Sequence, residues 1–157
     1  MDYSTILKGK RILIADDEPD VLESLEEILE MCHTDTASSY AMARDYLEKN
    51  IYDGAILDIM GIQGYNLLAI TSQKGIPTLM LTAHALSSDN FVKSIRQGAY
   101  AYIPKERMSE IDFFLADILL HVPEPPGLFG KWFDRLRPFY DKKFGRNWLE
   151  YYKNFWE

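Results

Sequence analysis

The sequence predicts an α/β fold in which five strand–helix units build one parallel, doubly wound sheet. Two observations indicate it. Short apolar runs of strand length alternate along the chain with longer segments whose apolar residues recur at helical spacing. Several of the apolar runs also end in polar residues, which a parallel sheet would gather at one edge. Such alternation favours a parallel sheet with right-handed crossovers.

Five strands follow from the apolar runs, and the second of them is the weakest. They are predicted at 12–15, 34–37, 54–57, 78–81 and 100–103. The helices between and after them are predicted at 19–31, in a segment ending near 49, at 65–73, in a segment ending at 98, and at 108–122. Ser87 or Ser88 is expected to cap the fourth helix. About 120 residues are enough for one well-buried core.

Five polar residues follow these strands in matching positions. Asp16 and Asp17 follow the first strand, Asp58 the third, Thr82 the fourth, and Lys105 the fifth after one proline. Each alone has an ordinary explanation, such as a helix cap or a turn. Together they indicate a ligand site at the carboxyl edge of the sheet.

The residue types point to a metal and a phosphoryl group. Three carboxylates crowd together if the first and third strands are neighbours, about 5 Å apart, and a divalent cation relieves their repulsion. Oxygen ligands suit Mg²⁺. Asp58 is then the candidate nucleophile that forms an acyl phosphate, while Lys105 and the Thr82 hydroxyl would stabilise the oxygens of the transferring group.

The motifs around these residues resemble those of response-regulator receiver domains, the CheY-like family. Ile-Leu-Ile-Ala-Asp-Asp-Glu-Pro from residue 12 is similar to the acidic first turn of the family, and Ile-Leu-Asp-Ile-Met from residue 56 to its phosphoacceptor strand. Met-Leu-Thr-Ala from residue 80 and Gly-Ala-Tyr-Ala-Tyr-Ile-Pro-Lys-Glu from residue 98 resemble the threonine and lysine strands. The resemblance covers about residues 8–122.

The resemblance implies a flavodoxin-like sheet of strand order 2-1-3-4-5 and a phosphorelay role. A histidine kinase or phosphotransfer protein would pass a phosphoryl group to Asp58, in a self-catalysed transfer rather than an enzymatic turnover. Mg²⁺ would be bound by Asp17 directly, by Asp16 mainly through water, and by Asp58 and the Met60 backbone carbonyl.

The family also implies a conformational switch and a tuning of dephosphorylation. Tyr102 aligns with the aromatic residue that swings inward as the threonine, here Thr82, moves toward the phosphoryl group. His84 and Met60 occupy the positions that tune loss of the phosphoryl group. As a single strand tyrosine and a single surface histidine, Tyr102 and His84 also have structural explanations.

Two departures from the family pattern stand out. The loop after Asp58 is shorter than usual and lacks a proline, with Gly61 and Gly64 supplying the flexibility of a tight turn. The usual proline after the lysine is absent, and Pro104 precedes Lys105 instead. We therefore expect a trans peptide bond after Lys105.

The composition agrees with a cytoplasmic protein that does not bind nucleic acid. The net charge is −7, and the one cysteine, Cys32, is expected to be a small buried hydrophobe. No basic stripe typical of a DNA-binding surface is present, and no apolar run approaches the ~18 residues of a membrane helix. We expect neither a signal peptide nor a DNA-binding or enzymatic output domain.

The C-terminal segment differs sharply from the rest. We divide the chain into a receiver domain at 1–122, a proline-rich linker at 123–128 and an amphipathic helical extension at 129–157. The last 35 residues contain 11 of the 21 aromatic residues and all three tryptophans. Two short helices are predicted by aromatic stripes: one with Trp132, Leu136, Phe139 and Tyr140, interrupted by Pro138 and ended by Gly145, and one with Trp148, Tyr151, Tyr152, Phe155 and Trp156.

Such short helices must pack on something, because they are unstable alone in water. Four targets are open: the chain's own receiver, with its fourth and fifth helices as the candidate face; a second copy in a homodimer; another, downstream protein; or a membrane surface. A helical aromatic stripe favours the first two, and the slight positive charge of the segment makes a membrane contact the least expected.

Two other functions remain as alternatives to phosphoryl signalling. A phosphate-independent pseudo-receiver would act only as an interaction module. A Mg²⁺-dependent aspartyl phosphatase of the haloacid-dehalogenase type would also use an aspartate nucleophile, but it would need a second acid two residues after it. Ile59-Met60 follows Asp58 and offers no such acid.

Overall fold

Five short parallel strands form one sheet in the computed structural model, which describes residues 2–84, 86–124 and 130–152. The strand order is β2-β1-β3-β4-β5, as the flavodoxin-like fold requires. The two central strands β3 and β4 are buried along their whole length. The strands are β1 (Arg11–Ala15), β2 (His33–Ala37), β3 (Gly54–Asp58), β4 (Thr78–Thr82) and β5 (Ala101–Pro104).

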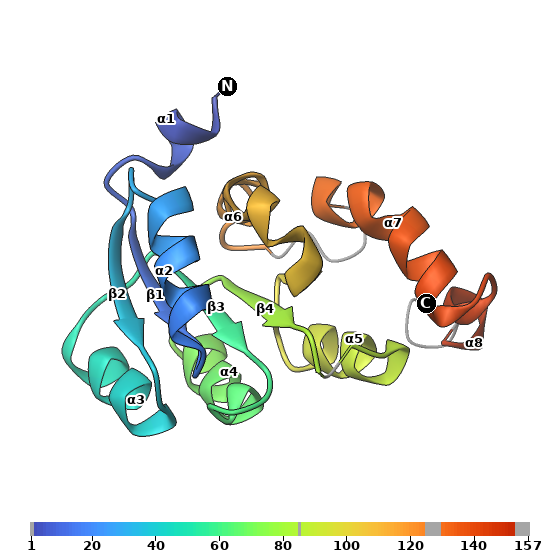
Figure 1. Ribbon diagram of the computed structural model, residues 1–157, viewed down its shortest axis with the longest axis horizontal. Helices are drawn as coiled ribbons and strands as arrows, with labels where there is room; N and C mark the ends of the chain where they lie inside the picture. The colour runs from blue at the N-terminus through green and yellow to red at the C-terminus, as the bar shows by residue number, and fades with distance from the viewer. Residues whose placement is uncertain (1, 85, 125–129, 153–157) are drawn as a thin grey trace.

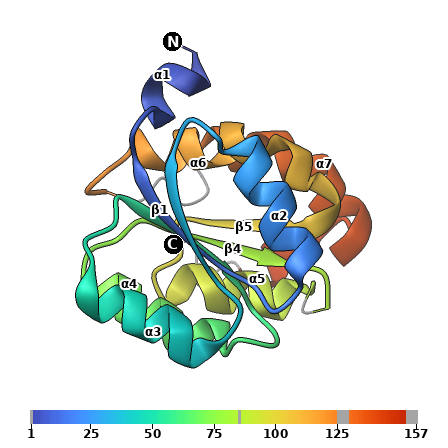
Figure 2. The same cartoon turned by 60° about the vertical axis from the view of Figure 1, so that its left-hand side comes forward.

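Helices cover both faces of this sheet. Figure 2 shows α2 and α6 on one face, and α3, α4 and α5 on the other. The helices that connect and follow the strands are α2 (Pro19–Ile28), α3 (Tyr40–Lys49), α4 (Gly64–Gln73), α5 (Ser88–Arg96) and α6 (Ile111–Leu119). Ser87, rather than Ser88, caps α5: its Oγ accepts a hydrogen bond from the Asn90 amide at 3.1 Å.

The structure differs from the expected boundaries at several places. Helix α2 ends at Ile28 rather than at residue 31, and α6 ends at Leu119 rather than at residue 122. The last helix of the receiver begins at Ile111 rather than at residue 108, because Lys105–Glu110 forms a separate 3₁₀ helix, η1, with a non-helical residue at Arg107. A short first helix, α1 (Tyr3–Leu7), was not predicted. Its five residues are too few to show a hydrophobic period, and its burial rests mainly on Leu7.

The described part of the C-terminal segment contains two helices, α7 (Lys131–Phe144) and α8 (Trp148–Tyr151). Pro138 does not interrupt α7, which continues through it, although proline removes one backbone hydrogen bond. Apolar burial on both sides of Pro138, at Leu136 and Tyr140, holds the helix together. Phe155 and Trp156 of the predicted second stripe, and most of the linker, lie outside the described residues.

Both helices lie against the chain's own receiver, beside α5 and α6 (Figure 1). This is the first of the four targets considered for the aromatic stripes. None of the helices in the described residues has the length and apolar composition needed to span a bilayer.

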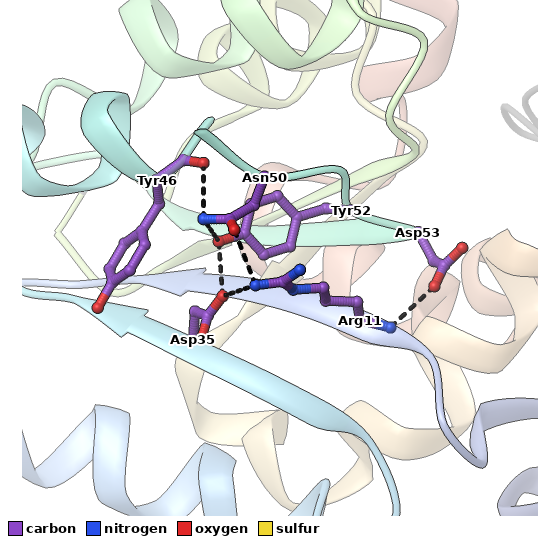
Figure 3. A network of polar contacts seen from close by, with 6 residues as sticks. All are labelled: Arg11, Asp35, Tyr46, Asn50, Tyr52 and Asp53. Carbon is purple, nitrogen blue, oxygen red and sulfur yellow. Dashed lines mark hydrogen bonds and ion pairs between the residues drawn. The ribbon is translucent and has the colours of Figure 1, made fainter. Parts of the chain in front are cut away.

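A polar network fixes the amino ends of the strands (Figure 3). The Arg11 guanidinium contacts the Asp35 carboxylate at 3.2 Å and the Asn50 side-chain oxygen at 2.9 Å. Tyr52 donates to the same carboxylate at 2.7 Å, and the Asp53 carboxylate accepts from the Arg11 amide at 2.8 Å. These contacts join β1, β2 and the segment before β3 at the end of the sheet opposite to the predicted site.

Candidate functional site

Strand register brings the predicted site residues to one edge. Ala15 pairs with Leu57, so that Asp16 and Asp58 come next on adjacent strands. Thr82, the last residue of β4, pairs with Pro104, and Lys105 follows directly. The site is therefore built from the carboxyl ends of β1, β3, β4 and β5, where parallel sheets hold their ligands.

Lys105 lies among three carboxylates. Its ammonium nitrogen is 3.0 Å from Asp16 Oδ2, 3.1 Å from Glu18 Oε1 and 3.3 Å from Asp58 Oδ1. Asp16 and Asp58 are only 1% and 4% exposed, whereas Glu18 is half-exposed. The two buried carboxylates therefore share one cation and leave a net negative charge in the site.

Burial and this crowding shift the pKa values of Asp16, Asp58 and Lys105. Burial, followed by the charge of Asp16, raises the pKa of Asp58 to about 6, against the opposing effect of Lys105. Burial also raises the pKa of Asp16. For Lys105, burial alone would lower the pKa, but Asp16 and Asp58 outweigh it and raise the pKa. An additional positive charge beside Asp16 and Asp58 would therefore stabilise their ionised carboxylates.

The acidic turn after β1 supplies oxygen ligands at close range. Carboxylate oxygens of Asp16, Asp17 and Glu18 lie within 4.8 Å of one another. Asp16 Oδ1 accepts a hydrogen bond from the Glu18 amide at 2.9 Å, which fixes the orientation of its carboxylate. Asp17 is exposed and points its carboxylate at the loop that follows β3.

That loop approaches Asp17 so closely that only glycine fits. Gly61 has φ +86°, and a Cβ there would lie 2.5 Å from Asp17 Cγ. Gly64, the first residue of α4, has no room either, since its Cβ would lie 2.7 Å from Ile59 Cα. Gln63 between them adopts a left-handed conformation. The short loop therefore packs directly onto the acidic turn and leaves Met60 half-exposed above it.

Thr82 and Tyr102 occupy the border between this site and a hydrophobic cluster. Both are buried. The Tyr102 hydroxyl accepts a hydrogen bond from the Ser87 amide at 3.2 Å, and its ring lies edge-on to Phe91 with centroids 5.3 Å apart. His84 is exposed, two residues after Thr82.

The structure thus brings Asp16, Asp58 and Lys105 into direct contact, with Asp17 beside them. Glu18 was not predicted as a site residue. Its position after two aspartates and before a helix-starting proline is typical of an acidic helix terminus, so its ion pair with Lys105 had no signal of its own.

The family model of the response regulator receiver domain matches residues 12–113. The chain belongs to this family. Its fold agrees with that assignment, and the members of this family are signalling modules of two-component systems. The matched residues include all of the site and end inside α6, so α7 and α8 lie beyond them.

Individual relatives agree with the receiver assignment. The chain is 34% identical over 103 residues to the two-component response regulator ARR18 of Arabidopsis thaliana, covering 62% of this chain and 16% of the relative. It is 34% identical over 102 residues to the response regulator GtcR of Aneurinibacillus migulanus, covering 62% of this chain and 42% of that protein. The receiver therefore spans less than half of these relatives.

Solved structures show the same fold. A CheY-like receiver domain protein from Methanospirillum hungatei is 28% identical and superimposes with a TM-score of 0.61, covering 72% of this chain and 98% of that chain. A Chloroflexus aurantiacus protein assigned to the response regulators is 30% identical with a TM-score of 0.63, covering 72% of this chain and 98% of that one.

Proposed function

We propose that this receiver accepts a phosphoryl group on Asp58 from the phosphohistidine of a histidine kinase or phosphotransfer protein. It then signals through protein contacts. The observation that carries the proposal is the ammonium of Lys105, 3.3 Å from Asp58 Oδ1 at the carboxyl edge of the sheet. In this proposal residues 1–122 form the receiver, 123–128 a linker, and 129–157 a helical C-terminal extension.

The transfer needs little covalent chemistry from the protein. An Asp58 carboxylate oxygen attacks the phosphorus atom, an oxygen–phosphorus bond forms, and the bond from phosphorus to the imidazole nitrogen of the donor breaks. The electron pair of that bond returns to the imidazole. The Lys105 ammonium would stabilise the negative charge that develops on the phosphoryl oxygens, because it already lies within reach of Asp58. The Thr82 hydroxyl would donate a hydrogen bond to a phosphoryl oxygen.

The donor set fits a Mg²⁺ ion. Asp17 would bind it directly, Asp16 mainly through water, and Asp58 with the Met60 carbonyl would complete the protein ligands. The clustered hard oxygen ligands of the acidic turn agree with such an ion. When bound, Mg²⁺ neutralises charge on the phosphoryl oxygens.

Loss of the phosphoryl group would depend on access of water to Asp58. Met60 and His84, both exposed at the rim, are the residues proposed to tune it. The imidazole of His84 would act only if it reaches the attacking water. Thr82 and Tyr102 would carry the change of state from the site toward α5.

Labelling with acetyl phosphate and Mg²⁺ tests the proposal. Intact-mass measurement should show one added phosphoryl group on the native chain and none on Asp58→Asn. Asp45→Asn is the matched control, because Asp45 is an exposed aspartate on α3, paired with Lys49 at 3.0 Å. It should label like the native chain. A native chain that does not label would be a phosphate-independent pseudo-receiver instead.

The phosphatase alternative gives a different result. Such an enzyme would release phosphate catalytically from a generic phosphomonoester, with many turnovers for each Asp58. We expect no turnover, because Ile59-Met60 after Asp58 supplies no second acid to protonate a leaving group.

A further inference from the structure

Helices α7 and α8 lie against the face of the receiver formed by α5, β5 and α6 (Figure 1). The side chains that they bury are large and mostly aromatic. They are Trp132, Phe133, Leu136, Tyr140 and Trp148. The exposed side of α7 carries charges, so that the helix is amphipathic with its apolar stripe against the receiver.

Phe91 of α5 is the centre of this contact. Its ring lies edge-on to Trp148, with centroids 5.0 Å apart, and to Tyr140, 5.1 Å apart. It also lies near Trp132 at 5.9 Å and Tyr102 at 5.3 Å. One receiver side chain therefore touches both C-terminal helices and the buried tyrosine of β5.

Polar contacts fix the position of α7 on this face. The Trp132 amide, in the first turn of α7, donates to Asp117 Oδ2 of α6 at 2.9 Å. The guanidinium of Arg135 is 3.1 Å from Glu110 Oε1 and lies 3.6 Å above the ring of Phe113. These contacts orient the helix, because each joins a specific group to a receiver element rather than to solvent.

Hydrogen bonds connect α7 with β5, and β5 with the start of α5, five residues after Thr82. The Tyr140 hydroxyl donates to the backbone carbonyl of Tyr102. The Tyr102 hydroxyl in turn accepts from the Ser87 amide at 3.2 Å. Ser87 closes the segment that begins at Thr82, the residue at the edge of the site. Helix α7 thus contacts β5, and Tyr102 of β5 in turn contacts Ser87 at the end of the β4–α5 loop.

We propose that docking of α7 on the α5–β5–α6 face and binding of a phosphoryl group at Asp58 are coupled, each strengthening the other, through Tyr140, Tyr102 and Ser87. The proposal rests on the proposed function of Asp58. In this proposal the C-terminal extension is an intramolecular ligand: its helix α7 occupies the α5–β5–α6 face of the same chain.

The sign of the coupling follows from the shared loop. A phosphoryl group that accepts a hydrogen bond from Thr82 restrains the start of the loop, and Tyr102 restrains its end at Ser87. Whichever occurs first, phosphoryl binding or docking of α7, restrains part of this loop. The other event then loses less conformational entropy, so the two favour each other. Thermodynamic reciprocity requires both effects to have the same size.

The affinity of the full chain for beryllofluoride, a phosphoryl mimic, in saturating Mg²⁺ tests this proposal by calorimetry. Tyr140→Phe keeps the buried ring and removes the hydroxyl that contacts Tyr102. We expect it to weaken beryllofluoride binding about two- to tenfold, the range that loss of one hydrogen bond gives. Tyrosines 151 and 52 provide matched controls.

The two controls separate coupling from other effects. Tyr151→Phe removes a hydroxyl from a side chain that is 83% exposed on α8, and should bind like the native chain. Tyr52→Phe removes the hydrogen bond to Asp35 at the far end of the sheet, so it lowers stability without touching the hydrogen bonds that connect α7 with β5 and α5. Its beryllofluoride affinity should also stay native.

Tryptophan emission gives a second reading, because all three tryptophans lie in the extension. In the native chain it should respond to beryllofluoride, and in Tyr140→Phe the response should need a higher concentration. Native affinity in Tyr140→Phe, tighter binding, or an equal loss in Tyr52→Phe would overturn the coupling while leaving the proposed function intact. A native chain that neither labels nor binds the mimic would overturn both.

Discussion

Asp58 is held in an environment that opposes its charge, and the cation beside it, Lys105, is shared with other carboxylates. The carboxylate is buried beside Asp16, and Lys105 contacts both, together with Glu18. The Lys105 ammonium therefore lies close to Asp58 but is not paired with it alone, because it also contacts Asp16 and Glu18. At the residue scale, the site is therefore prepared for a group that brings negative oxygens together with a divalent cation.

Replacing Lys105 should slow phosphoryl transfer far more than it disturbs the fold. In Lys105→Met the stem of the side chain is retained, but no ammonium faces the transferring oxygens. We expect the rate of Asp58 labelling by acetyl phosphate to fall roughly 10²-fold or more, as loss of one transition-state donor does elsewhere. Lys49→Met, which removes an exposed lysine paired with Asp45, should label at the native rate. Equal rates in the two variants would contradict the role of Lys105.

Gly61 should control the binding of Mg²⁺ through Asp17. In Gly61→Ala the new methyl group would lie 2.5 Å from Asp17 Cγ, so the carboxylate must move. We expect Mg²⁺ affinity to fall about tenfold or more, as it does when a ligand's support is lost. Gly75→Ala is the matched control, because Gly75 also has positive φ (+72°) but meets nothing within 4 Å. Both variants bear the backbone strain, and only the first should lose Mg²⁺ in a titration.

Five residues of the candidate site could be predicted from the sequence, whereas Glu18, which also contacts Lys105, could not. Asp16, Asp17, Asp58, Thr82 and Lys105 each follow an apolar run, and parallel register then places them together without further information. Glu18 has no such strand before it. Its contact with Lys105 depends on how the first turn of α2 lies, which a local pattern does not contain.

At the scale of elements, an aromatic stripe predicts that a helix is buried but not what buries it. The spacing of Trp132, Leu136 and Tyr140 was enough to predict α7. The identity of the face depends on Phe91, the one aromatic residue of α5, and on Asp117, a buried acid in the apolar helix α6. Neither residue stands out in the sequence, because each is meaningful only when the two helices are brought together.

Asp117 should act as a cap supplied by another element. Gly130 precedes α7 and has no side chain to cap it, and the Trp132 amide instead donates to Asp117 of α6. In Asp117→Ala this buried amide loses its partner, and we expect about 1–2 kcal/mol of lost stability in denaturant unfolding, with a shifted tryptophan emission. Asp117→Asn keeps an acceptor and should lose less. Asp134→Ala, on the exposed side of α7, should be nearly neutral.

An Asp117→Ala protein with native stability and native emission would mean that the aromatic contacts alone position α7. The order Ala, Asn, native in both measurements would instead assign the effect to the hydrogen bond. Because both readings come from one helix terminus, they should change together.

Across the whole molecule, the two ends of the sheet serve different purposes. The amino ends of the strands are joined by the Arg11, Asp35 and Tyr52 network, in which the guanidinium and the tyrosine hydroxyl both contact the Asp35 carboxylate (Figure 3). The carboxyl ends instead gather three carboxylates around one ammonium. Stability is thus concentrated where no chemistry is proposed, which allows the other edge to remain electrostatically unfavourable until a ligand arrives.

The buried tyrosines should make the whole molecule sensitive to alkaline pH. Burial raises the pKa of Tyr140 well above its ordinary value of about 10, and the nearby Tyr102 adds to the shift. Because the pKa in the folded state exceeds that of the unfolded chain, the contribution of Tyr140 is fully present below about pH 10. It is lost as pH rises above that value toward the folded pKa, by about 1.4 kcal/mol for each pH unit.

Denaturant unfolding of the native chain and Tyr140→Phe at a series of pH values tests this linkage. Other groups titrate in the same range, so the difference between the two slopes decides. Between pH 10 and 11 the free energy of unfolding should fall less in Tyr140→Phe, by about 1 kcal/mol over that interval, because Tyr140 of the native chain releases most of one proton on unfolding there. Tyr151→Phe, which changes an exposed tyrosine, should keep the native slope. Parallel curves for the native chain and Tyr140→Phe would mean that Tyr140 is accessible to solvent, and that α7 does not stay closed over β5.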